Sequence, residues 1–443
     1  MSFRMTTRWC KVSSLTSGSA QAHQPDQATL AELELAVGEL LFTRAEDSLS
    51  GEVRHHAVLA ANPLAEWLVW NWWRLCFEPQ PAGKQAPGWL EAHRMANVGG
   101  GWLWPNVEFV SDGVRMRIGA KASAASAHQP VRYLSADHAV IPLAHFVQGV
   151  DAFVERVIER LSSQAVAGAD LPHMYQELLA ERADPEAATY RRLEALLGFD
   201  PDECPDDRVM TLYQDAQGLG LEAIAELAAG AGSSPLSASQ LKRWARSQGC
   251  ESDKQNRLGW VGQGYRVDHQ LPAWRNGVKA AHALRAQERL TDAAIGNRQL
   301  AEWFAVPPGL FEEQRHNKAL AYELAFESDK SRVLLRSRWQ AGRRFEVARL
   351  LGDVLLQAEP EPLHLATAQN TYRQKLQRAF AAELLCPIEA LSELLAGDFS
   401  DDAIQGAADT FGVSPMTVTV QLLNNRVMQS DELNGLDPDW AVA

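Results

Sequence analysis

The sequence predicts a mostly helical protein with a smaller α+β domain near its N-terminus. Apolar residues recur at helical spacing through much of the 443-residue chain, most clearly in 147–161. The segment 106–118 instead alternates apolar and polar residues around Asp112-Gly113, a pattern typical of a hairpin with a primed turn. Because a chain of this length exceeds one ordinary hydrophobic core, we expect two or three domains.

The composition is that of a globular protein, with 46% hydrophobic and 22% charged residues. A net charge of −14 argues against nucleic-acid binding by the chain as a whole, because binding to phosphates requires a basic surface. The five cysteines form no Cys-x-x-Cys pair, so neither a disulfide framework nor a cysteine zinc site is expected. The chain has no run of roughly 18 apolar residues. Met1–Leu15 also lacks the apolar core of a signal peptide, so the expected location is cytoplasmic, with no membrane partner.

We expect four regions along the chain. Residues 1–28 are rich in Ser, Thr, Gln and Ala and predict a flexible tail. Residues 29–165 predict a Trp-rich α+β domain, 166–270 a helical middle region, and 271–443 a C-terminal domain. Frequent leucines predict a first helix from Gln27 to about Thr43.

The N-terminal domain is marked by its tryptophans, seven of the chain's fourteen lying between Trp67 and Trp104. In the helix predicted to begin near Pro63, apolar residues fall on nearly every face, which indicates burial. Core packing therefore explains most of these rings, and an aromatic pocket for a ligand or peptide is the alternative. His55, His56 and His93 lack partners at metal-ligand spacing and are expected to be structural or exposed.

Helical patterns dominate the middle of the chain. From Leu171 to Gln248 the sequence carries apolar stripes with charge pairs four residues apart, interrupted by the linker-like stretch 230–235. Two further helices are predicted within 277–306. A strand at 333–336 then precedes a helix that begins near Arg343.

Two fragments, 343–353 and 378–387, carry the most specific signal. In many zinc endopeptidases a His-Glu-x-x-His helix places two imidazoles one turn apart on the metal, and its glutamate acts as general base. The chain resembles the ImmA/IrrE family of such enzymes at Phe345, Ala348 and Gly352, at 380–387 and at 408–414, within a region of about 277–428. The resemblance implies a zincin-like helical C-terminal domain. Active members of the family cut repressor proteins in stress responses and in the control of mobile elements.

The family's chemical groups are replaced in this chain. Arg349 stands at the first histidine position, Leu350 at the glutamate and Asp353 at the second histidine. The segment 372–378, ahead of the second matching helix, contains no acid that could serve as the family's third ligand. A guanidinium stays protonated and repels a metal cation, and leucine cannot act as a base. We therefore predict no metal, no other cofactor and no catalytic residues.

Two hypotheses describe the emptied site. Arg349 and Asp353 are four residues apart, so they could pair in the former metal position, or both could face solvent. A zinc peptidase with altered ligands is the enzymatic alternative, using Asp353 with Glu361 or His364.

The sequence therefore favours a catalytically degenerate ImmA/IrrE-like protein that regulates by binding a protein partner. Bacterial stress response, phage defence and mobile-element control are the expected settings. A DNA-binding regulator is a third hypothesis. The candidate interaction patch for an acidic or nucleic-acid partner comprises Arg332, Arg336, Arg338, Arg343 and Arg344, although such a cluster is often only a solvated face. The element 401–427 has helix-turn-helix spacing. Its second helix carries only Arg426 as a cation and is expected to be a packing element.

Overall fold

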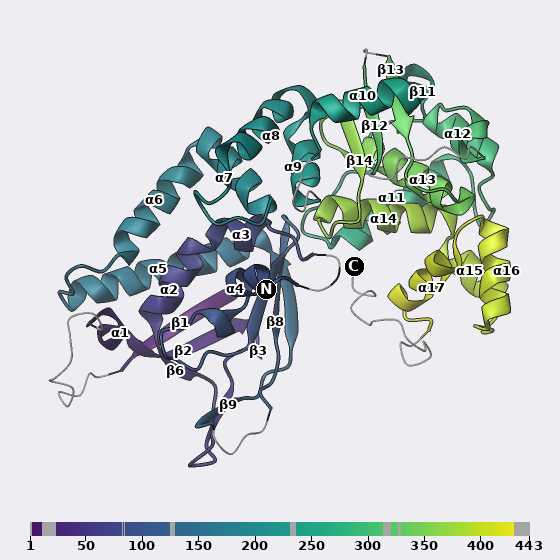
Figure 1. Ribbon diagram of the computed structural model, residues 1–443. Coiled ribbons are helices and arrows are strands. Elements are labelled where there is room, and N and C mark those ends of the chain that lie inside the picture. The colour runs from purple at the N-terminus through teal and green to yellow at the C-terminus, as the bar shows by residue number, and fades with distance from the viewer. Residues whose placement is uncertain are drawn as a thin grey trace. The chain divides into compact units, whose positions relative to one another are not determined.

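The computed structural model describes residues 2–10, 24–81, 83, 85–124, 129–230, 236–312, 320–326 and 329–428. These residues are mostly helical with several small sheets, as the sequence predicts (Figure 1). The chain divides into two compact units, Met1–Met210 and Thr211–Ala443. The expected middle region, 166–270, is divided between them. In the part of the chain that is described, no helix has the length and apolarity needed to cross a bilayer.

The first unit contains three small antiparallel sheets. Their orders are β1-β2-β3 with β6 beside β2, then β10-β8-β7, and β5-β4-β9. The strands are β1 (Phe3–Trp9), β2 (Leu30–Val37), β3 (Leu40–Leu41), β4 (Ala45–Asp47), β5 (Val53–Arg54), β6 (Ala57–Ala60), β7 (Val107–Ser111), β8 (Arg115–Ala120), β9 (Val131–Tyr133) and β10 (His138–Pro142).

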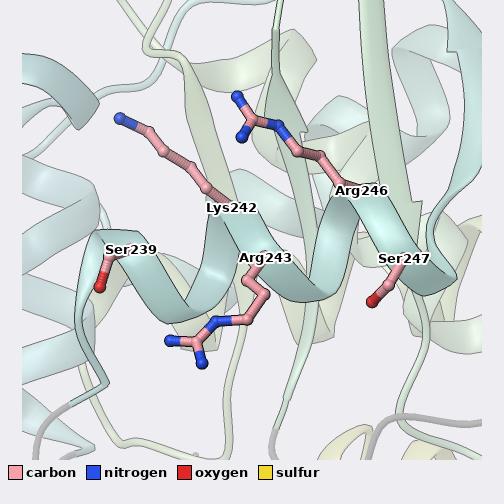
Figure 2. A pocket seen from close by; sticks show the side chains of 5 residues that line it. All are labelled: Ser239, Lys242, Arg243, Arg246 and Ser247. Carbon is pink, nitrogen blue, oxygen red and sulfur yellow. The ribbon is translucent and has the colours of Figure 1, made fainter.

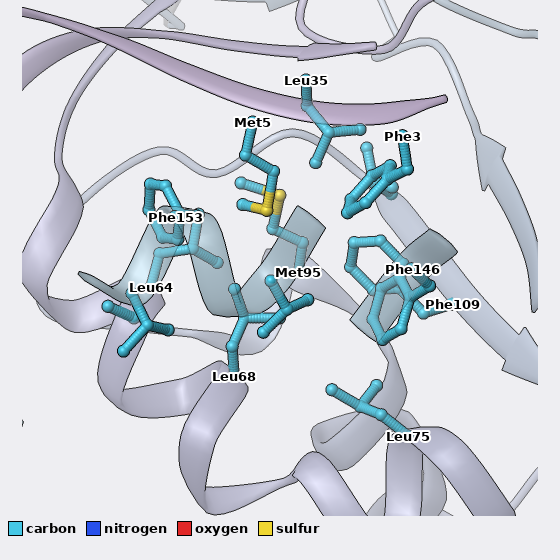
Figure 3. Close-up of a cluster of buried hydrophobic side chains, with 14 of the residues drawn as sticks. Phe3, Met5, Leu35, Leu64, Leu68, Leu75, Met95, Phe109, Phe146 and Phe153 are labelled. Atoms are coloured by element: carbon cyan, nitrogen blue, oxygen red, sulfur yellow. The ribbon is translucent and has the colours of Figure 1, made fainter. Parts of the chain in front are cut away.

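Helices pack on these sheets to form one core. The longest, α5, is amphipathic and places Phe146 and Phe153 against β1 and α2, where they meet Phe3 and Leu64 (Figure 3). The helices are α1 (Gln24–Ala28), α2 (Ala61–Trp70), α3 (Trp72–Phe77), α4 (Pro87–His93), α5 (Leu143–Ser163), α6 (Leu171–Ala183) and α7 (Pro185–Leu196), with a 3₁₀ turn at Met95–Asn97.

Two predictions about the N-terminal segment are wrong. The segment expected as a flexible tail contains β1 and α1, while 11–23 lie outside the described residues. The predicted helix from Gln27 to Thr43 is largely β2, which pairs with β1 from Ala31 to Val37. Leu33, Leu35 and Val37 are buried and alternate with half-buried Glu32 and Glu34. This period of two is that of a strand with one buried face.

The hairpin prediction is confirmed. β7 and β8 pair from Val107–Ala120 to Ser111–Met116, and Asp112-Gly113 lie in the connecting turn. Gly113 has a φ of 90°, as the first central position of a primed turn requires, and Asp112 Oδ1 accepts hydrogen bonds from the amides of Val114 and Arg115.

The tryptophan cluster belongs largely to the core. Trp72, Trp73, Trp89 and Trp104 are buried, whereas Trp70 is about half exposed. Trp72 and Trp73 meet edge to face with ring centroids 4.8 Å apart. Their packing agrees with the core interpretation of this region.

The second unit combines a four-stranded antiparallel sheet with helices. The sheet order is β11-β13-β12-β14, formed by β11 (Cys250–Asp253), β12 (Ala321–Ala325), β13 (Lys330–Leu334) and β14 (Leu363–Ala366). The helices are α9 (Leu221–Ala229), α10 (Ala238–Gln248), α11 (Ala273–Gln287), α12 (Asn297–Phe304), α13 (Gln340–Leu356), α14 (Tyr372–Leu385), α15 (Ile388–Leu395), α16 (Asp401–Phe411) and α17 (Pro415–Asn424), with 3₁₀ turns at Lys254–Asn256 and Pro308–Phe311. Helix α8 (Asp206–Leu219) crosses the boundary between the units. The predicted linker at 230–235 lies outside the described residues except for Gly230.

Helices α11, α13 and α14 form the centre of this unit, and two glycines let them approach closely. A Cβ added to Gly277 of α11 would lie 2.6 Å from Leu376 O and 2.7 Å from Phe380 N, both backbone atoms of α14. A Cβ on Gly352 of α13 would lie 2.4 Å from Cδ1 of Phe380. The absence of side chains at these two positions therefore sets the spacing on both sides of α14.

Gly277→Ala should destabilise the protein, although alanine is the better helix former. The backbone of α14 cannot yield as a side chain can, so we expect a loss of about 1–3 kcal/mol in the free energy of unfolding. Gly406→Ala in α16 is the matched control, because a Cβ there meets nothing within 4 Å. It should stabilise by about 0.5–1 kcal/mol. Urea unfolding measures both variants, and equal effects would contradict the close approach.

Candidate functional site

The positions that the resemblance aligns with the metal ligands lie in the interior of the second unit. Arg349 and Asp353 are 7% and 2% exposed, so the solvent-facing hypothesis is wrong. They also do not pair with each other. Arg349 donates to the carbonyl of Thr367, and Asp353 pairs with Arg373 instead. Leu350 is fully buried within the apolar core.

Asp353 is held by three side chains. Arg373 donates from Nε to Oδ1 at 2.8 Å and from Nη2 to Oδ2 at 2.7 Å, a bidentate pair. His364 Nδ1 lies 2.9 Å from Oδ2, and Gln377 donates to Oδ1 at 2.7 Å. Burial alone would raise the pKa of Asp353, but the Arg373 guanidinium, aided by His364, outweighs it and holds that pKa well below its usual range.

Arg373 also joins a second carboxylate to this network. Its Nη1 lies 3.0 Å from Glu361 Oε2, while its other two nitrogens bind Asp353. Burial would lower the pKa of Arg373, yet the charge of Asp353 raises it above the ordinary arginine value. The sequence analysis missed Arg373, because nothing in its spacing shows that α14 turns this side chain toward Asp353.

Arg349 is buried without a carboxylate at ion-pair distance among the described residues. Its Nη2 donates to Thr367 O at 2.6 Å and to Gln374 Oε1 at 2.5 Å. Burial, together with repulsion from Arg378, lowers the pKa of Arg349 to about 9. Gln374 fixes this arrangement, because the same Oε1 accepts from the Thr367 amide at 2.8 Å.

These residues do not fit a zinc ion. The candidate ligands are already bound: the carboxylates of Asp353 and Glu361 pair with the Arg373 guanidinium, and His364 is bound to Asp353. A metal there would have to displace a buried cation that already satisfies those oxygens. Within the described ranges, no group of three or more His, Cys, Asp or Glu side chains could hold a metal.

A small pocket of about 170 Å³ lies next to this cluster. Glu226 of α9 lines it and is buried, with both carboxylate oxygens within 2.9 Å of the Thr371 hydroxyl. Burial outweighs the charge of Arg373 and raises the pKa of Glu226 to about 6. The remaining lining is Leu227, Gly230, Leu236, Leu320, Arg336, Ala366, Thr367, Ala368 and Gln369.

The five-arginine patch is not one surface. Arg343 is 1% exposed and donates to Leu310 O, and Arg344 is 4% exposed and donates to Ile295 O, Gly412 O and Asn297 Oδ1. Both therefore support the fold and cannot meet a partner. Arg336 and Arg338 are exposed, and Arg332 is partly exposed and paired with Glu251.

Helix α10 presents a basic surface that the sequence analysis missed. Lys242, Arg243 and Arg246 are exposed, and with Ser239 and Ser247 they line a shallow hollow (Figure 2). The buried face of the helix contains Ala238, Leu241 and Ala245. That apolar spacing could have identified the cationic face, because the exposed positions of a helix follow from its buried ones.

The C-terminal helix pair and the histidines have structural surroundings. In α17, Val418 and Leu422 are fully buried in the core, which agrees with a packing role. His93 is fully buried with Nδ1 2.9 Å from Trp89 O, and burial lowers its pKa to about 4. His56 lies 3.6 Å from Glu32.

No protein-family model and no curated protein matches this chain.

Asp353→Ala should strongly destabilise the protein, because it removes the bidentate partner of the buried Arg373 guanidinium and leaves the weaker charges of Glu226 and Glu361 to compensate it. We expect a loss of roughly 3–5 kcal/mol in the free energy of unfolding at neutral pH. Glu359→Ala, which removes an exposed acid six residues later, is the control and should leave the urea midpoint unchanged.

The pH dependence provides a second readout for this pair. The folded pKa of Asp353 is depressed, so its contribution is complete above the unfolded pKa of about 4 and is lost as the pH falls toward the folded value. The difference in stability between the natural protein and Asp353→Ala should therefore shrink at acid pH. A difference independent of pH would contradict the charge-based account.

Proposed function

We propose that this chain is a catalytically degenerate, zinc-free ImmA/IrrE-like protein that acts by binding a protein partner. The proposal rests on one observation: arginine side chains, and not metal ligands, provide the positive charge at the emptied site. Guanidinium groups of Arg349 and Arg373 occupy the region where the resemblance would put a metal, and each is fixed by hydrogen bonds.

The resemblance is supported by the packing of its motif positions. Gly352 and Phe380, two of the residues that carry it, lie against each other, and a Cβ at Gly352 would overlap the phenyl ring. Helices α13 and α14 pack together, as the two matching fragments require. The packing residues of the resemblance are present and its catalytic groups are absent, which together favour a protein that binds a partner rather than one that cleaves it.

The residues present do not support hydrolysis. A zinc peptidase needs a metal-bound water and a carboxylate base beside it, and Leu350 at the base position lies in the apolar core. Asp353 accepts hydrogen bonds from Arg373 and Gln377 and is therefore not free to remove a proton from water. A role in bacterial stress response, phage defence or mobile-element control belongs to the same proposal and rests on the family resemblance alone.

The purified chain should contain no stoichiometric zinc, even when it is produced in zinc-supplemented medium. Elemental analysis after gel filtration measures the metal, and melting curves with and without a chelator should coincide. One zinc per chain that is lost in Asp353→Ala would instead establish the altered-ligand peptidase. An active His-Glu-x-x-His peptidase, produced and purified in the same way, serves as the positive control for zinc.

A second candidate function, binding of nucleic acid, is favoured by helix α10. Lys242, Arg243 and Arg246 project from one short helix that contains no acidic residue, and two serines lie beside them (Figure 2). Lysine, arginine and serine side chains are common ligands of phosphate groups. The exposed cations, unlike the buried Arg343 and Arg344, are accessible to a polyanion.

Duplex DNA binding at low salt should depend on this face if α10 serves that function. Replacing Lys242, Arg243 and Arg246 by glutamine should then weaken binding and lower the salt slope by about 0.9 for each lost phosphate contact. Glutamine replacements at the exposed Arg266, Arg289 and Arg298 make the same change in charge and should have little effect. Fluorescence anisotropy over a salt series is the measurement. Absence of binding by the natural chain at low salt would eliminate this function and leave the protein partner.

A further inference from the structure

The pocket beside the emptied site carries opposite charges on its wall. Glu226 comes from α9, whereas Arg336 follows β13, and both line the same space of about 170 Å³. A cavity of roughly 150 Å³ is known to accept a molecule as large as benzene. The pocket is therefore large enough for a small organic molecule, and the Arg336 side chain that lines it is about half exposed.

Neither charge forms a close ion pair with a described side chain. Glu226 accepts hydrogen bonds from the neutral hydroxyl of Thr371, and Arg373 and Gln374 also favour its charged form, but no cation lies at ion-pair distance from it among the described residues. Arg336 lies 3.7 Å from Glu346, whose carboxylate also accepts hydrogen bonds from the amides of Arg336 and Ser337. A ligand could therefore add a cation near Glu226 and an anion near Arg336.

Arg349, which lies behind the pocket wall, adds a positive charge near Thr367. Arg349 is bound to Thr367, one of the lining residues, and adds positive charge without a carboxylate at ion-pair distance. Burial lowers the pKa of Arg349 to about 9 and raises that of Glu226 to about 6, so each buried charge is incompletely compensated. A bound molecule with both charges would stabilise the ionised form of each group.

Five aliphatic side chains make up one part of the wall, and Thr367 and Gln369 add polar groups to it. Leu227, Leu236 and Leu320 line the pocket, together with Ala366 and Ala368. Small ligand sites commonly combine apolar walls with a few polar groups that fix orientation. These side chains would accept an unbranched or branched alkyl group and would disfavour a polar one, because burying a polar group without a partner is costly.

We propose that this pocket binds a small aliphatic α-amino acid, with its carboxylate toward Arg336, its ammonium toward Glu226 and its side chain among the leucines. The ligand class follows from the two opposite charges, the apolar wall and the size of the space. This site goes beyond the proposed partner binding and does not require it.

The test uses the full-length chain and defined probes. L-Leucine and L-valine should bind with one site per chain by isothermal titration calorimetry, and should raise the melting temperature. Isovalerate, which lacks the ammonium, and isoamylamine, which lacks the carboxylate, should each bind at least about tenfold more weakly, since each loses one charged hydrogen bond.

Two variants connect binding to the pocket. Arg336→Gln should weaken L-leucine binding about 10- to 100-fold, because the carboxylate loses its charged partner. Arg338→Gln is the matched control, since this exposed arginine lies over the Trp339 ring and does not line the pocket. Glu226→Gln should weaken L-leucine while leaving isovalerate unchanged. Circular dichroism establishes whether the buried Glu226→Gln variant folds. If it does not fold, Arg336→Gln alone tests whether L-leucine binds in this pocket.

The proposal would be overturned by any of three results. The first is that neither L-leucine nor L-valine binds at millimolar concentration. The second is that isovalerate binds as tightly as L-leucine, and the third is that Arg336→Gln and Arg338→Gln have the same affinity for L-leucine. The first outcome would not affect the zinc measurement on which the partner-binding proposal depends, so the two proposals can fail separately.

Discussion

The buried ion pair between Asp353 and Arg373 is the constraint on which the second unit depends. A charge taken out of water must be compensated almost completely by its surroundings. Asp353 obtains this compensation from Arg373, His364 and Gln377, which come from α14 and β14. The pair therefore helps to fix α13 against α14, which approach closely at Gly352.

The same pair explains how a metal-site face can remain buried in the proposed zinc-free protein. In a peptidase of this kind a divalent cation neutralises the ligands, whereas here two guanidinium groups provide the positive charge. Asp353 faces Arg373, and Arg349 faces the neutral Gln374 in the segment that lacks acids. Replacing Asp353 or Arg373 alone would leave a buried charge without its closest partner.

The sequence was sufficient for features whose signal is local. The β7–β8 hairpin follows from Asp112-Gly113, and the central helix from the periodicity after Arg343. The sequence was insufficient where tertiary contacts decide between two possible secondary structures or between two possible partners of a side chain. Leu33, Leu35 and Val37 fit a strand, but with Leu40 and Leu41 they also fit a helix, and pairing with β1 selects the strand. Likewise Arg373 could be assigned to Asp353 only once α14 was placed against α13.

The arginines illustrate why a count of charged residues could not locate the site. Arg344 uses the carbonyls of Ile295, Phe411 and Gly412 and the Asn297 side chain, and Arg285 donates to three carbonyls. These buried guanidinium groups are satisfied by neutral acceptors and hold segments together. Arg349 has only two acceptors, both on Nη2, and lies behind the pocket that Arg336 and Glu226 line. The position of an arginine in the fold, rather than its presence in the sequence, therefore decides whether its charge supports packing or faces a pocket.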